Sequence, residues 1–114
     1  MERSDRTKHT VLRGSPVGLE QGREYQAGYT LVFSNSNYYI LKLWCMEHRS
    51  WYMSPNRDGS GSFTVFGKKV TSETGEVYFQ NPVGLARPYG DDAHIEIVLP
   101  DFPRRYYMSL FPSN

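Results

Sequence analysis

The chain has little cysteine: Cys45 is the single one among 114 residues. One thiol excludes an internal disulfide and leaves no cysteine cluster for a structural zinc site. Because Cys45 lies inside the apolar run 38–45, we expect a small buried side chain rather than a nucleophile. The fold must therefore be stabilised by its hydrophobic core, and a chain of this length can build such a core without disulfide bonds or structural metal ions.

Long apolar runs and an excess of charge are also missing. No stretch approaches the roughly 20 apolar residues that a membrane helix needs, and the first residues, MERSDRTKHT, hold no apolar core of a secretory signal. The net charge of +1 argues against a nucleic-acid partner. The cytoplasm is the expected default location, and a processed or non-classically exported chain would look the same.

Motifs of nucleophilic catalysis and phosphate binding are absent too. The chain contains neither G-x-S-x-G nor H-E-x-x-H. The stretch from Gly61 to Gly67-Lys68 has the wrong spacing for a phosphate-binding loop, and Lys69 stands where Ser or Thr should bind magnesium. We therefore expect no enzyme and no cofactor, although carboxylates that converge in space could still serve acid–base catalysis.

Aromatic residues, by contrast, are abundant: nine tyrosines, six phenylalanines and two tryptophans. They occur in short runs between Gly, Pro, Asn and Ser clusters, which is typical of strands. No window shows the i, i+3, i+4 apolar spacing of a helix. The segments with strand character are 8–13, 28–34, 38–45, 51–53, 63–66, 76–80, 93–99 and 106–111.

These segments predict an all-β fold. We expect a single-domain antiparallel β-sandwich of about seven or eight short strands, with a small β-barrel or a trefoil-like fold as the alternative. The β-rich domain should cover residues 8–114, after a flexible polar arm over residues 1–7.

Local turn signals divide the chain further. Segments 28–34 and 38–45 should form a hairpin, because Asn35-Ser36-Asn37 between them is turn material. Glycine and proline predict a loop over 14–22 and irregular structure over 81–92.

Aromatic rings that do not fit in the core would mark a binding surface. Rings stack on sugars with little rotamer entropy to lose, and neighbouring arginines donate hydrogen bonds. We therefore predict a non-catalytic, lectin-like binding module with carbohydrate as the leading ligand. The predicted ligand-binding residues are Tyr38, Trp44, Arg49, Trp51, Tyr52, Arg57, Arg105 and Tyr107.

One alternative is an interaction protein, such as a small inhibitor, effector or structural subunit. Its partner would be a protein surface, or a second copy in a homo-oligomer, reached through edge strands.

Another alternative is a small metal-dependent enzyme. Asn56 and Asp58 begin a partial calcium loop, but Gly67 stands where a bidentate Glu is required. Asp92, His94 and Glu96 occupy alternate positions of one strand. A His-x-carboxylate pair on a strand is also the first part of some iron sites that use two histidines and one carboxylate. A polar hairpin loop and a solvated strand face explain both patterns without a metal.

The stretch Gly28 to Trp44, with Trp51-Tyr52 after it, resembles the aromatic headgroup-binding region of actinoporin-like cytolysins and related fungal lectins. The amphipathic N-terminal helix of the cytolysins is missing, so no site residues are carried over. The resemblance implies sugars or lipid headgroups as ligands.

Overall fold

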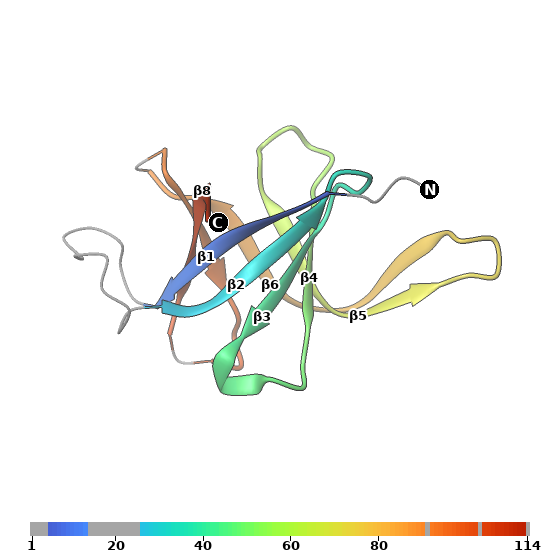
Figure 1. The fold of residues 1–114 in the computed structure, drawn as a ribbon, viewed down its shortest axis with the longest axis horizontal. Coiled ribbons are helices and arrows are strands. Elements are labelled where there is room, and N and C mark those ends of the chain that lie inside the picture. The colour runs from blue at the N-terminus through green and yellow to red at the C-terminus, as the bar shows by residue number, and fades with distance from the viewer. Residues whose placement is uncertain (1–4, 14–25, 91, 103, 114) are drawn as a thin grey trace.

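The computed structural model describes residues 5–13, 26–90, 92–102 and 104–113. Within these ranges eight strands form one antiparallel sheet that closes into a barrel (Figure 1). The elements are β1 (Arg6–Arg13), β2 (Gln26–Phe33), β3 (Tyr39–Leu43), the 3-10 turn η2 (Trp44–Met46), β4 (Trp51–Pro55), β5 (Phe63–Thr71), β6 (Val77–Pro88), β7 (His94–Val98) and β8 (Tyr106–Ser113).

Each strand pairs with the next along the chain, and β8 returns to pair with β1. In that closing pair Val11 faces Met108 and Arg13 faces Tyr106. The all-β prediction is confirmed, and the closed barrel is the architecture given as its alternative. The predicted hairpin is also confirmed, because Gly28 of β2 pairs with Leu43 of β3.

The hydrophobic core fills the inside of the barrel. An eight-stranded barrel is just wide enough for inward side chains to meet across its axis. Trp51 is the largest fully buried side chain. The core consists of Val11, Leu41, Leu43, Trp51, Met53, Val65, Ala86, Ile95, Ile97, Leu99, Tyr106 and Met108.

Two polar side chains are buried with these residues. The Thr30 hydroxyl donates to the sulfur of Met108 at 3.0 Å. The His9 Nδ1 lies 2.8 Å from the carbonyl oxygen of Ser109, and its ring meets Tyr39 edge to face. Both polar groups are therefore satisfied inside the barrel, as buried polar groups usually are.

The hairpin of β5 and β6 extends past the barrel wall, toward the right in Figure 1. The last β5 residue that pairs with β4 is Phe66, and the first β6 residue that pairs with β7 is Leu85. Between these points the two strands pair with each other, as far as residues 77 and 71. Both outer edges of the extended part are thus open within the described chain.

Several local predictions need correction. Residues 81–88 belong to β6 rather than to an irregular segment. The left-handed backbone of Asn81 and a register shift between Val65 and Phe66 let the strand continue through this stretch. Strand 38–45 ends at Leu43, and Cys45 lies exposed in η2 instead of buried.

Two predicted segments lie wholly or partly outside the described residues. The loop over 14–22 lies outside the described residues. Of the predicted arm over residues 1–7, residues 1–4 also lie outside them, while Arg6 and Thr7 belong to β1.

Candidate functional site

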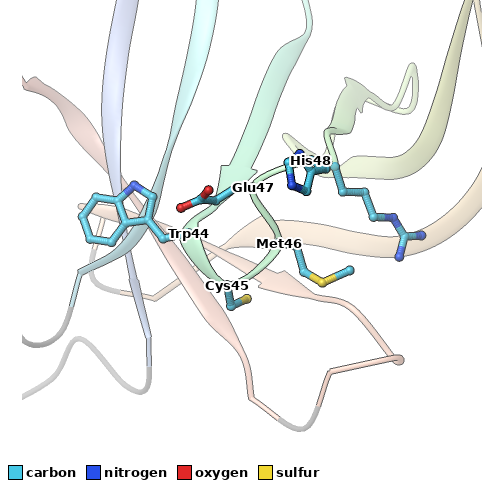
Figure 2. A pocket seen from close by; sticks show the side chains of 6 residues that line it. Trp44, Cys45, Met46, Glu47 and His48 are labelled. Atoms are coloured by element: carbon cyan, nitrogen blue, oxygen red, sulfur yellow. The ribbon is translucent and has the colours of Figure 1, made fainter.

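The turn that follows β3 carries an exposed apolar group at one end of the barrel. Trp44 is 51% exposed and Met46 is 38% exposed. Figure 2 shows the indole of Trp44 pointing away from Met46 and His48, with the carboxylate of Glu47 directed toward the indole side. A half-exposed indole on a short turn offers a flat apolar face to a ligand.

Trp44 borders two hollows. One, of about 520 Å³, runs along the turn and is lined by residues 44–49. The other, of about 240 Å³, lies between the turn and the starts of β2 and β8. The lining of the smaller pocket is Arg13, Gln26, Ala27, Trp44, Cys45, Arg104 and Tyr106. These residues come from four separate parts of the chain, which the pairings of β1 with β2, β2 with β3 and β1 with β8 bring together.

Three aromatic rings pack against one another beside this pocket. The Trp51 ring meets Phe102 edge to face at 5.7 Å, and Phe102 meets Tyr106 at 6.2 Å. The Arg49 guanidinium lies 5.1 Å from the Trp51 ring centroid, a cation–π contact that covers the ring. Trp51 is 1% exposed, so the predicted surface position of Trp51 is wrong. Its position on β4 directs the ring inward.

Tyr106 presents a hydroxyl to this pocket from the first position of β8. Burial raises the pKa of Tyr106, and the neighbouring Cys45 thiol raises it further, while Arg104 and Arg13 oppose the shift. The phenol is therefore neutral at ordinary pH and can act as a hydrogen-bond donor.

Tyr38 and Tyr52 belong to a second aromatic cluster, outside the barrel. Their rings lie 6.4 Å apart, and both contact Phe79 of the extended hairpin. Lys69 Nζ lies 5.7 Å from each tyrosine centroid, and Phe66 stacks on Phe79. The cluster fixes the hairpin against the barrel wall, so much of the area of these rings is already occupied by protein.

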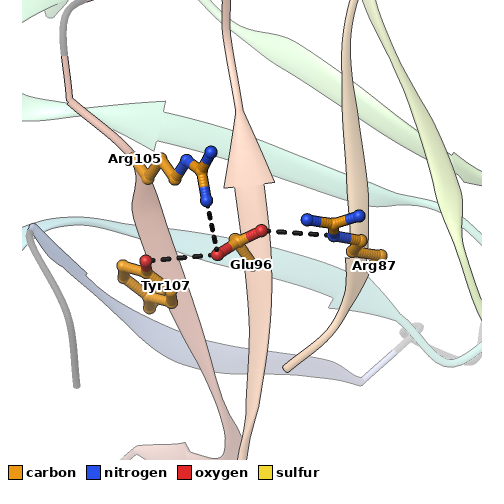
Figure 3. Close-up of polar contacts among 4 residues, drawn as sticks. All are labelled: Arg87, Glu96, Arg105 and Tyr107. Atoms are coloured by element: carbon orange, nitrogen blue, oxygen red, sulfur yellow. Dashed lines mark hydrogen bonds and ion pairs between the residues drawn. The ribbon is translucent and has the colours of Figure 1, made fainter. Parts of the chain in front are cut away.

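Arg105 and Tyr107 are part of a polar network on the outer face of the barrel (Figure 3). Both contact the carboxylate of Glu96, which is 4% exposed. Arg87 approaches the same carboxylate at 3.2 Å. Tyr107 is 5% exposed and meets the ring of Tyr89 edge to face. Tyr107 is therefore too deeply buried to stack on a ligand, whereas the Arg105 side chain is 59% exposed and paired with Glu96.

The loop between β4 and β5 holds the remaining predicted residues. Arg57 is exposed there, at the opposite end of the barrel from η2 (Figure 1). Asn56 bonds to Ser62 and Thr64. Hydrogen bonds from Ser60 lower the pKa of Asp58. The polar loop therefore satisfies its own oxygen atoms, as the turn interpretation predicts.

The other metal candidates lie in β7 and in the turn before it. Asp92 lies in the turn before β7, with a left-handed backbone, His94 begins β7, and Glu96 is engaged by two arginines. Within the described residues, no three His, Cys, Asp or Glu side chains lie close enough together to hold a metal ion.

Sequence reasoning missed Arg13 and Gln26 as site residues. No local motif marks them: Gln26 lies beside the turn through the pairing of β2 with β3, and Arg13 lies beside Gln26 through the pairing of β1 with β2. Comparison with protein-family models, curated proteins and solved structures finds no match for this chain. Within the described ranges, no helix has the length and apolar character needed to cross a membrane.

Proposed function

We propose that this protein is a non-catalytic binding module whose ligand site is the barrel end around Trp44, and that its ligand is a carbohydrate. The observation that carries the proposal is the half-exposed indole beside the 240 Å³ pocket. Sugar rings offer apolar faces that stack on indole, and their hydroxyls need donors and acceptors close by. Gln26, Glu47 and the Tyr106 hydroxyl supply such groups at this end.

The test is a glycan array followed by titration of intrinsic tryptophan fluorescence with each hit. Trp44 is expected to respond, because it is one of only two tryptophans and the other is buried. Trp44→Ala should weaken binding by about tenfold or more, equivalent to about 1.4 kcal/mol.

Tyr78→Ala is the matched control, since Tyr78 is an aromatic residue of similar exposure, at 52%, on the extended hairpin. It should bind sugar like the wild type. Equal losses in both variants, or an array without any saturable hit, would refute the proposed site.

A second candidate function is a protein-interaction module that uses the β5–β6 hairpin. Val77 is 39% exposed and Tyr78 is 52% exposed, and the hairpin edges are open within the described chain. Open edges accept further strands. Light scattering should then show self-association that Tyr78→Lys reduces and Trp44→Ala leaves unchanged; a monomer at all concentrations argues against a homo-oligomer.

A further inference from the structure

The Trp44 pocket contains two positive charges that are not balanced within the described chain. Arg13 is the last residue of β1, and Arg104 lies two residues before β8. The pairing of Arg13 with Tyr106 brings both arginines to the same pocket as Trp44. Resting on the proposed function, we infer that the ligand is an acidic sugar whose anionic group is held by Arg13 and Arg104.

The guanidinium groups of Arg13 and Arg104 both influence the hydroxyl of Tyr106 electrostatically. Both oppose the rise in the pKa of the Tyr106 hydroxyl, as positive charges close to that oxygen must. An anionic group beside the hydroxyl would therefore be attracted by both arginines, and the neutral phenol could donate a hydrogen bond to it.

Two other arginines of the barrel differ from Arg13 and Arg104 because they form ion pairs. Arg87 and Arg105 both pair with Glu96, whereas Arg13 and Arg104 form no ion pair with any residue in the described ranges. Both are exposed. Glu47, on the same rim, points toward the indole side in Figure 2, where it can accept hydrogen bonds from sugar hydroxyls.

The residue types match an acidic sugar better than a neutral one. Guanidinium binds carboxylate or sulfate through two parallel hydrogen bonds, which a hydroxyl does not reproduce. The indole of Trp44 would take the apolar face of the ring, and the anionic substituent would reach the arginines of the adjoining pocket. Carboxylated and sulfated sugars share this chemistry.

The experiment compares three oligosaccharides of the same length by calorimetry: one of uronic acids, its neutral counterpart and a sulfated analogue. The wild type should bind at least one acidic ligand about tenfold more tightly than the neutral one. Arg13→Gln and Arg104→Gln should each reduce this ratio, and the double variant should bring it close to one. A preference for the uronic or the sulfated arm identifies the source of the anion.

Arg57→Gln is the control, because it removes the same charge from an exposed arginine at the opposite end of the barrel. It should leave the ratio unchanged, and an equal loss would show non-specific attraction of polyanions and overturn the inference. Equal binding of acidic and neutral sugars, lost in Trp44→Ala, would overturn the inference and leave the proposed function standing. Absence of binding to all three, together with an empty array, would overturn both.

Discussion

The hydroxyl of Tyr107 donates a hydrogen bond to Glu96 Oε2 at 3.2 Å, on the outer face of the barrel wall. These residues are cross-strand neighbours on β7 and β8, and both are almost completely buried. A buried carboxylate is stable when its oxygens are paired, and here Arg87 and Arg105 complete the pairing from either side. The network joins β6, β7 and β8.

Glu96→Ala should lower the free energy of unfolding by about 2–3 kcal/mol, because it removes a buried carboxylate and leaves the Tyr107 hydroxyl without its acceptor. Tyr107→Phe should cost about 1 kcal/mol. Arg87→Gln is the control and should cost less than about 1 kcal/mol, since the Arg87 side chain is 68% exposed and its ion pair is screened by solvent. Urea denaturation measures all three, and equal losses would contradict the network.

Alkaline pH should destabilise the protein through Tyr106 and Tyr107. Burial raises the pKa of both phenols above the ordinary value of 10.0, and Glu96 adds to the rise at Tyr107. The folded state therefore holds these protons more tightly than the unfolded chain. The stabilisation is fully present below about pH 10 and is lost as pH rises through the folded-state values.

The measurement combines urea denaturation between about pH 9 and 11 with phenol ionisation followed by absorbance. Tyr106 and Tyr107 should ionise late, as should the exposed Tyr78, whose pKa is raised by its hydrogen bond to Glu76. Tyr107→Phe should reduce the dependence of stability on pH. A free energy of unfolding that stays constant or increases over this range would contradict the assignment.

Local elements of this fold follow from the sequence, whereas barrel closure does not. Strand alternation and the Asn35-Ser36-Asn37 turn predict the β2–β3 hairpin from neighbouring residues. Alternation is the same in a sandwich and a barrel, so the distant pairing of Arg13 with Tyr106 has no local signal. For the same reason the sequence does not reveal that Arg104 and Tyr106 line the pocket beside Trp44.

At the candidate site, the sequence likewise does not predict which of the two tryptophans, Trp44 or Trp51, is exposed. Both belong to aromatic segments of similar composition, yet one is 51% exposed and the other 1%. The difference arises because β3 ends at Leu43 and η2 reverses the chain before β4 begins. Which tryptophan faces inward depends on the geometry of this turn, which composition does not specify.

The two tryptophans should therefore respond differently to substitution and to quenchers. Trp51→Ala should lower the free energy of unfolding by about 3–5 kcal/mol, because it opens a cavity at the end of the core. Trp44→Ala should change it by less than about 0.5 kcal/mol. Iodide should quench one part of the wild-type fluorescence and leave the other protected, and the accessible part should disappear in Trp44→Ala. Uniform quenching would contradict the buried position of Trp51.

The close contact of β2 with β3 gives a direct test of the barrel wall. A Cβ atom at Gly28 would lie 2.0 Å from the carbonyl oxygen of Lys42, a backbone atom that cannot rotate away. Gly28→Ala should therefore force the paired strands apart and cost roughly 2–3 kcal/mol. Gly90→Ala is the control, because a Cβ there meets no atom within 4 Å, and it should change stability by less than about 0.5 kcal/mol. Urea denaturation followed by circular dichroism compares them, and a Gly28→Ala variant as stable as the wild type would contradict the register of Gly28 with Leu43.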